Sequence, residues 1–233
     1  MSELLEQDNI YLADKPLDRT SFDIVAAFKR AFNLKKIGHS GTLDPRATGL
    51  LILCSGKKTK MINDFIEYDK EYNGIIRIGA TTPTFDTESE EENIVNTENI
   101  TEEMIESARE KFSGEIEQIP PMHSAVKHKG KPLYKLARKG EVIERKVRKA
   151  VISELVLKRL SDTEIYFNVS CSKGTYIRTL ADDIGRELGV GGYLKTLQRT
   201  RIGKYKLEDF NLTLADVNDT MKFYNDYVKT LAL

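Results

Sequence analysis

Apolar residues recur at helical spacing in four stretches of the chain. Thr20 or Ser21 can cap the first predicted helix, and a shorter helix should follow residue 60. Thr101 can cap a helix over residues 101–113, and Gly189 ends one expected near 175–188. The residues expected to face inward are, in chain order, Ile24, Val25, Phe28 and Phe32; Met61, Ile62, Phe65 and Ile66; Met104, Ile105, Ala108 and Phe112; and Ile177, Leu180, Ile184 and Leu188.

Short apolar runs bounded by turn residues predict the strands. They lie at residues 9–13, 50–54, 72–80, 147–158 and 164–171. A strand-like stretch at 194–207 precedes a short C-terminal helix. Strands and helices mix without regular βαβ alternation, and several strands adjoin through short turns. The pattern therefore predicts an α+β fold, a mixed, largely antiparallel sheet flanked by helices, in a single domain spanning residues 1–233.

The chain has no net charge, but its charges are segregated. Residues 86–106 contain nine acidic residues and no basic ones, which is typical of a solvated face. Residues 127–149 contain ten Lys or Arg and two Glu, and ten minus two gives +8. Because clustered cations gain from counterion release, this basic run is interpreted as a surface that binds nucleic-acid phosphates.

Cysteine usage and hydropathy point to a cytoplasmic protein. Cys54 and Cys171 are the only cysteines and form no C-x-x-C pair, which favours a reducing compartment. The N-terminus lacks the basic and apolar regions of a signal peptide. No apolar run approaches the roughly 20 residues that a membrane helix needs, so no membrane association is expected.

The stretch GHSGTLDPRATGLLILCSGKKTK, residues 38–60, is the richest in candidate chemistry. A P-loop reading fails because Leu51 stands where its first glycine belongs and Lys58 where its Ser or Thr belongs. Three histidines without a metal-binding spacing predict no metal site, and Ser40 is in the wrong frame for a hydrolase elbow. Asp44 remains, either as the start of a turn before proline or as a carboxylate presented to a substrate.

Six segments resemble motifs of one known family. GHSGTLDPRATGLL closely resembles the signature G-H-x-G-x-L-D-P-x-A-x-G of the bacterial tRNA pseudouridine-55 synthases, the TruB family. The others, in order, are similar to further motifs of that family: DKPLDRTS, KEYNG, GATTPTFD, PPMHSAVKHKGKPLYKLARKG and CSKGTYIRTLADDIGRELG. The resemblance covers roughly residues 9–207. It favours the catalytic reading of Asp44 and implies the pseudouridine synthase fold.

The resemblance implies a reaction and a set of roles. Uridine 55 in the T-loop of tRNA would be flipped out and isomerised to pseudouridine without a cofactor. Asp44 would be the nucleophile, Arg178 its ion-pair partner, and Tyr72 would stack on the target base. The remaining residues implied at the RNA site are Tyr176 and Leu197, which line the base; His39, which fills the space left by flipped nucleotides; Lys15, which supports the loop; and Lys127, Lys129 and Lys131, which hold the T-arm.

Two departures from the family pattern bear on these expectations. Asp18 replaces a usual glycine, and Asp tolerates the left-handed backbone that such a turn needs. The 26 residues after Leu207 are too few for the C-terminal PUA domain of longer members, so no separate PUA domain is expected. The segment near residues 123–149, here called the basic clamp, is expected to hold the RNA within the catalytic domain. The protein is expected to act as a monomer without an obligatory protein partner.

Two alternatives stay open at this point. The chain could be a non-catalytic RNA-binding or RNA-folding module, although such a module would be expected to lose at least one of Asp44, Tyr72 and Arg178. It could also be a synthase that acts on another RNA, as the related guide-RNA-dependent enzymes do. Those enzymes are usually paired with a PUA domain and protein partners.

Overall fold

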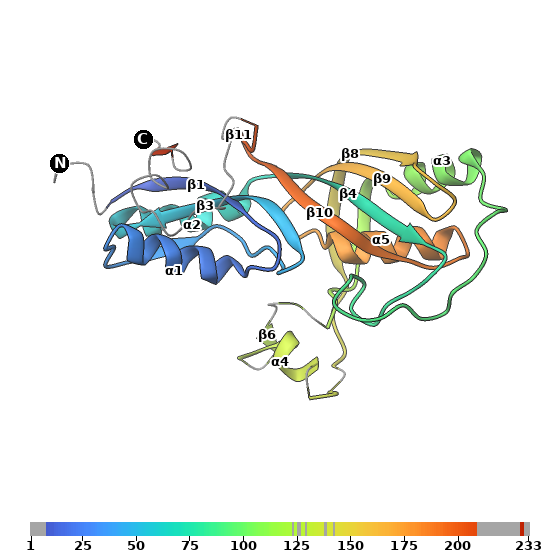
Figure 1. Cartoon of the computed structure of the whole chain (residues 1–233), viewed down its shortest axis with the longest axis horizontal. Helices are drawn as coiled ribbons and strands as arrows, with labels where there is room; N and C mark the ends of the chain where they lie inside the picture. The colour runs from blue at the N-terminus through green and yellow to red at the C-terminus, as the bar shows by residue number, and fades with distance from the viewer. Residues whose placement is uncertain are drawn as a thin grey trace. The chain divides into compact units, whose positions relative to one another are not determined.

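The computed structural model describes residues 8–122, 124, 127–128, 130–137, 139–141, 143–208 and 229–230 (Figure 1). The chain divides into two compact units. The first unit comprises Met1–Tyr72 and Leu197–Leu233, and the second comprises Asn73–Thr196. Strands β4 (Lys70–Ile78) and β10 (Gly192–Ile202) each pass from one unit into the other. That the chain acts as a single domain stays a prediction.

The sheet of the first unit is centred on β3 (Ala47–Ser55). Strand β1 (Ile10–Lys15) pairs with β3 in antiparallel fashion and β10 pairs with it in parallel fashion. Short strands complete the sheet: β2 (Ile37–His39) on β3, β11 (Tyr205–Lys206) on β10, and β12 (Lys229–Thr230) on β1. The parallel pairing of β3 with β10 brings together segments about 150 residues apart in the sequence, as the register Arg199↔Gly49 records.

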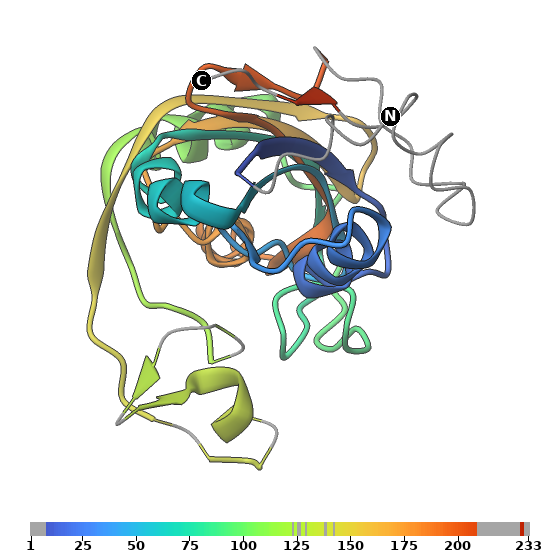
Figure 2. The ribbon, with the colours of Figure 1, turned by 90° about the vertical axis from the view of Figure 1, so that its left-hand side faces the viewer.

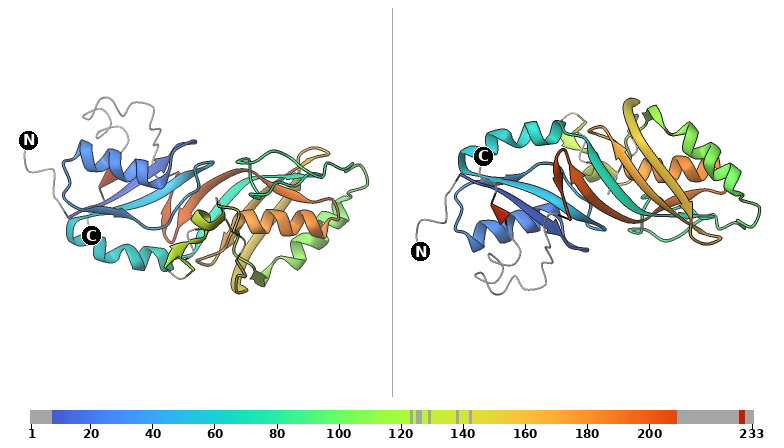
Figure 3. Two further views of the ribbon diagram at one scale, coloured as in Figure 1. Left: turned by 90° about the horizontal axis from the view of Figure 1, so that it is seen from below. Right: turned by 90° about the horizontal axis from the view of Figure 1, so that it is seen from above.

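Helices cover both faces of this sheet, which explains why β3 is apolar along almost its whole length. Helix α1 (Ser21–Ala31) packs on the face that includes Tyr11 and Leu51. On the opposite face, the 3-10 helix η1 (Gly56–Met61) and helix α2 (Ile62–Glu67) pack against Leu12 and Leu50. Figure 3 shows α1 and α2 on opposite sides of the strands. Successive strand residues point to opposite faces, so each strand supplies both cores.

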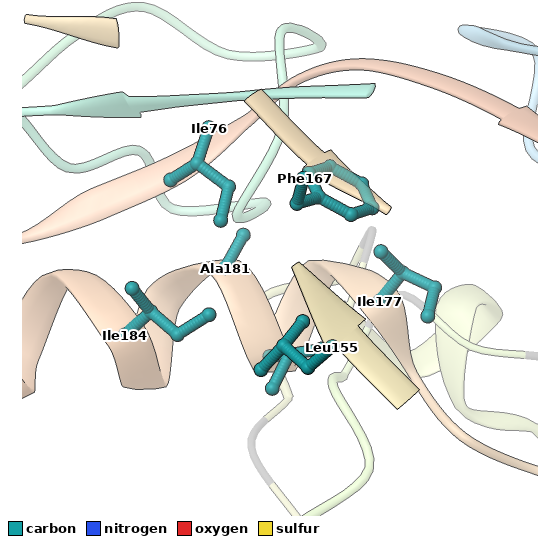
Figure 4. Close-up of a pocket in the computed structure, with 7 residues that line it drawn as sticks. Ile76, Leu155, Phe167, Ile177, Ala181 and Ile184 are labelled. Carbon is teal, nitrogen blue, oxygen red and sulfur yellow. The ribbon is translucent and has the colours of Figure 1, made fainter. Parts of the chain in front are cut away.

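The second unit contains the strand order β10–β4–β9–β8–β5. The bounds of the strands not yet given are β5, Gly114–Gln118; β8, Arg148–Arg159; and β9, Glu164–Cys171. Helix α3 (Glu102–Lys111) packs on β8, and helix α5 is Ile177–Glu187. Apolar side chains of α5 meet those of β4, β8 and β9 around a small hollow in the core (Figure 4). Its lining includes Ile76, Phe167 and Ile177.

The segment between β5 and β8 carries most of the predicted basic clamp. Strands β6 (Lys127–His128) and β7 (Lys131–Pro132) form a two-stranded antiparallel sheet, followed by helix α4 (Leu133–Ala137). In Figure 2 these elements stand at the end of the long connections that leave β5 and return to β8.

The predicted architecture, a mixed sheet flanked by helices, is confirmed, and so are the caps Thr20 and Thr101. Two predicted core residues are wrong: Ile66 is 37% exposed and Met104 is 39% exposed. Successive residues of a helix point about 100° apart. The adjacent residues Phe65 and Ile105 are buried, so Ile66 and Met104 point away from the core. The predicted C-terminal helix lies outside the described residues.

No helix among the described residues combines the length and hydropathy needed to cross a membrane.

Candidate active site

Asp44 lies in the loop of residues 40–46, which connects β2 to β3. At its start, the Ser40 amide donates a hydrogen bond to the Ile52 carbonyl at 3.0 Å, and at its end the Ala47 amide donates to the Asp44 carbonyl at 3.0 Å. Gly41 has a φ of 125°, which L residues with side chains rarely adopt. The loop is thus tied to β3 at both ends, and Asp44 is half-buried at the turn into that strand.

The segment of residues 15–21 holds this loop by hydrogen bonds. The amide of Asp18 donates to the Pro45 carbonyl at 2.9 Å, and Asp18 has a φ of 59°, which confirms the expected left-handed turn. The Ser21 hydroxyl accepts a hydrogen bond from the Leu43 amide at 2.9 Å and lies 3.2 Å from the Leu43 carbonyl. Both residues flanking Asp44 in the sequence, Leu43 and Pro45, are therefore held by the same segment.

Lys15 is fully buried under the loop and donates to three backbone carbonyls. Its Nζ lies 2.9 Å from the carbonyl oxygen of Pro16, 2.6 Å from that of Arg19 and 3.3 Å from that of Pro45. Burial lowers the pKa of Lys15 to about 8, while the negative charge of Asp44 acts in the opposite direction. The Lys15 ammonium and the Asp44 carboxylate therefore attract each other.

Three more predicted residues belong to the first unit. His39 ends β2 and is half-buried, and burial lowers its pKa, with a further contribution from the positive charge of Arg199. Leu197 lies on β10 opposite Ala47, and its carbonyl accepts a hydrogen bond from the Thr48 hydroxyl at 3.3 Å. Tyr72 lies on β4 and is 9% exposed. His39 and Leu197 therefore lie on strands that pair with β3, the strand that the Asp44 loop enters.

In the second unit, Arg178 forms a buried ion pair that sequence reasoning missed. It is the second residue of α5, and its Nη1 lies 3.4 Å from Oδ2 of Asp86 and 3.2 Å from the Thr84 carbonyl. Only 7% of the Arg178 side chain and 5% of the Asp86 side chain are exposed. The predicted pairing of Arg178 with Asp44 stays a prediction.

The backbone around Asp86 is shaped to present its carboxylate. Phe85 has a φ of 61°, which is strained for a bulky residue, and its carbonyl accepts a hydrogen bond from the Leu194 amide at 3.0 Å. The Thr82 hydroxyl donates to the Asp86 carbonyl at 2.8 Å. Asp86 ends GATTPTFD, one of the six segments that resemble family motifs, so the sequence contained a signal for this residue. Nothing in the segment indicated that Arg178 is its partner.

The remaining predicted RNA-binding residues are also in the second unit. Tyr176 is the N-terminal cap of α5, and the Gln118 side chain bridges its backbone, accepting from its amide at 2.9 Å and donating to its carbonyl at 3.1 Å. Lys127 and Lys131 lie on the paired strands β6 and β7. Lys129 lies outside the described residues.

Among the described residues, no group of three or more His, Cys, Asp or Glu side chains is arranged to hold a metal ion. The chemical groups assembled in the first unit are instead a carboxylate on a rigid loop and a buried ammonium beneath it.

Comparison with known proteins places this arrangement among the pseudouridylate synthases. Residues 29–177 match the family model described as TruB family pseudouridylate synthase, N-terminal domain, and residues 178–233 match that of the tRNA pseudouridylate synthase B C-terminal domain. The tRNA pseudouridine synthase B of Chlorobaculum tepidum is 50% identical over 214 residues, which cover 90% of this chain and 89% of the relative. That of Phocaeicola vulgatus is 48% identical, with 88% and 89% covered. The chain belongs to the TruB family of pseudouridylate synthases.

Solved structures share the fold. A chain from the structure titled "Crystal Structure of a Cbf5-Nop10-Gar1 Complex" aligns with a TM-score of 0.72 at 30% identity, covering 94% of this chain and 56% of that one. A chain from an H/ACA RNP bound to a substrate RNA aligns with a TM-score of 0.70 at 27% identity, covering 96% and 57%. This chain therefore spans a little over half the length of these structural relatives.

Proposed function

We propose that this protein is a tRNA pseudouridine synthase that converts uridine 55 in the T-loop of tRNA to pseudouridine. Membership of the TruB family supports the reaction, and the names of relatives that match about nine-tenths of the chain support tRNA as the substrate. The structural observation that carries the proposal is the Asp44 loop, fixed on both sides of Asp44 by hydrogen bonds to residues 15–21. Such rigidity suits a side chain that must attack at one position.

The reaction needs a nucleophile but no net change in redox state. The N1–C1′ bond of uridine breaks, the uracil turns, and a C5–C1′ bond forms; C5 gives up its proton and N1 gains one. The Asp44 carboxylate is the nucleophile, attacking either the base or C1′, and the neighbouring Lys15 ammonium attracts it electrostatically. Because protons are the only species exchanged, the isomerisation proceeds without metal or cofactor.

The target base leaves the RNA stack before the chemistry, at a cost of roughly a few kcal/mol that contacts in the site offset. Tyr72 stacks on the flipped base, and Tyr176 and Leu197 line its other sides. His39 fills the vacated space in the T-loop; the lowered pKa of its imidazole supports this, because a neutral ring inserts among bases at less desolvation cost than a charged one. Arg178, held by Asp86, orients the Asp44 carboxylate.

Binding energy for the T-arm comes mainly from the cations of residues 127–149, among them Lys127, Lys129 and Lys131. We further propose that the protein acts in the cytoplasm, as a monomer and without an obligatory protein partner. The chain then forms one catalytic domain that recognises the T-arm of tRNA.

Mapping pseudouridine in a complete tRNA transcript after incubation with the purified protein tests this proposal. The expected result is pseudouridine at position 55 only, and none in a matched transcript with cytidine at that position. Pseudouridine at another position, or modification only of a different RNA supplied with a guide, would contradict the substrate. Binding of tRNA without any pseudouridine would instead support a non-catalytic RNA-binding module.

A further inference from the structure

Arg199 is a buried cation directly behind the Asp44 loop. Its side chain belongs to β10 in the first unit, and the residue is only 2% exposed. Nε donates a hydrogen bond to the Leu50 carbonyl at 2.7 Å, and Nη2 donates to the Gly41 carbonyl at 3.2 Å. No carboxylate pairs with Arg199 among the described residues. A buried charge without an ionic partner is costly, and the two charge-assisted hydrogen bonds to backbone carbonyls offset part of that cost.

The backbone of Arg199 is fixed by an unusually close approach of two strands. Arg199 lies opposite Gly49 in the parallel pairing of β10 with β3, and Gly49 has a φ of 101°. A Cβ atom at position 49 would lie 2.3 Å from the Arg199 carbonyl oxygen, so only glycine permits this contact. The guanidinium is therefore aimed from a rigid support, and its two donors join a strand residue, Leu50, to a loop residue, Gly41.

Arg199 and Lys15 hold opposite ends of the same loop. Arg199 donates to the Gly41 carbonyl on one side of Asp44, and Lys15 donates to the Pro45 carbonyl on the other. The two cations come from different strands, β10 and β1, that flank β3. Each neutral carbonyl gains a charged donor, and charge-assisted hydrogen bonds are stronger and more directional than neutral ones.

We propose that Arg199 is a positioning residue for catalysis, which fixes the Asp44 loop next to His39 by bridging the Gly41 and Leu50 carbonyls. The inference rests on the proposed function for its catalytic consequence but not for its structural part. A direct role in gripping RNA phosphates is disfavoured by the 2% exposure of Arg199. A role confined to stability would leave the turnover of the folded protein unchanged.

Arg199→Lys and Arg199→Met test the proposal, with Arg201→Lys as the matched control. Lysine keeps the charge but lacks the planar fork that reaches two carbonyls, whereas methionine removes the charge at similar length. Arg201 lies two residues along the same strand, is half-buried, and pairs with Glu71 at 3.2 Å. For each variant, the thermal midpoint, the dissociation constant for tRNA and the single-turnover rate of pseudouridine formation are measured on the full chain.

We expect Arg199→Lys to lower the single-turnover rate at least tenfold while the tRNA dissociation constant stays within threefold of wild type. Arg201→Lys should stay within twofold in both. A rate within twofold for folded Arg199→Lys would overturn the proposal. So would a weaker tRNA affinity that accounts for the whole loss, because Arg199 would then act in binding.

Nuclear magnetic resonance tests the structural part independently of activity. The Gly41 amide signal should move in Arg199→Lys but not in Arg201→Lys, and the pKa of His39 should rise in Arg199→Met because a neighbouring positive charge is lost. If Arg199→Met does not fold, the lysine variant still decides. An unmoved Gly41 signal in Arg199→Lys would overturn the proposal, whether or not the wild-type protein makes pseudouridine. A wild-type protein that makes no pseudouridine would refute only the proposed function.

Discussion

Asp86→Asn removes the negative charge from the buried pair with Arg178 and changes the side-chain shape very little. The Arg178 and Asp86 side chains are 7% and 5% exposed, so solvent cannot replace the lost partner. Removing one partner of a buried pair typically costs about 3–5 kcal/mol. We expect the lower end, about 3 kcal/mol, because Arg178 keeps its hydrogen bond to the Thr84 carbonyl and the new amide oxygen can still accept from the Glu88 amide.

The assay is equilibrium unfolding in urea, followed by circular dichroism, with Asp162→Asn as the control. Asp162 is also paired with an arginine, Arg159, but 79% of its side chain is exposed, so its substitution should change the free energy of unfolding by less than about 0.5 kcal/mol. For a protein of this size, 3 kcal/mol corresponds to a thermal midpoint lower by about 6–12 °C.

Under conditions where Asp86→Asn is fully folded, its turnover should also fall, because Arg178 is no longer held. An Asp86→Asn protein as stable as wild type within about 0.5 kcal/mol would refute the energetic reasoning. Such a result would mean that the charge of Asp86 contributes little to stabilising the buried arginine.

Three further predictions follow from the first unit and from the basic segment. Burial raises the pKa of Asp14 from 3.8 to about 6, so the folded state carries a desolvated charge above pH 6. Asp14→Asn should therefore raise the free energy of unfolding by about 1 kcal/mol at pH 7.5, after discounting for solvent screening. This gain should vanish below about pH 4, where Asp14 is protonated in both states. Urea unfolding at pH 7.5 and below pH 4 measures the difference. Because the pKa of Lys15 is about 8, the ammonium loses its proton as pH rises through that value, and turnover should decline. Arginine stays protonated, so the pH–rate profile of Lys15→Arg should lack this decline, even if its maximal rate is lower. A decline that persists in Lys15→Arg would exclude Lys15 as its cause. An isolated T-arm stem-loop should reach a kcat/KM within about tenfold of full-length tRNA, or roughly 1.4 kcal/mol, whereas a deficit of a hundredfold or more would show that contacts outside the T-arm matter.

Local features of the fold could be predicted from the sequence because local chemistry determines them. A cap at Thr20 or Ser21 follows from a hydroxyl before an apolar repeat, and Thr20 is the one observed. Asp18 stands where the family has a glycine, and Asp tolerates the left-handed backbone found there. The buried strand β3 follows from an uninterrupted apolar run. These features need no knowledge of which segments meet in space.

The buried ion pair and the buried arginine that sequence reasoning missed both depend on distant pairing. Arg178 and Asp86 are 92 residues apart, and no pattern within either segment indicates that they form a buried pair. Arg199 is one of two closely spaced arginines in the stretch QRTR, and only the parallel pairing of β10 with β3 decides that it is buried while Arg201 is half-exposed. Charge alone predicts a surface position for both residues.

The catalytic roles of Asp44 and Tyr72 came from resemblance to a family, whereas the charge pattern alone already predicted phosphate binding by the basic run. Spacing alone left Asp44 as either a turn residue or a catalytic carboxylate. The structure adds the loop contacts and the buried Lys15, which give the catalytic reading a physical basis.

We propose above that the Asp44 carboxylate performs the chemistry on uridine 55. The most direct test compares wild type with Asp44→Asn in single-turnover pseudouridine formation on one tRNA transcript, with tRNA affinity measured in parallel. Asn preserves the shape of the side chain but is not a nucleophile of comparable strength. We therefore expect no detectable pseudouridine at position 55 and a tRNA dissociation constant within a few-fold of wild type. Measurable turnover by an Asp44→Asn preparation free of wild-type protein would contradict the account.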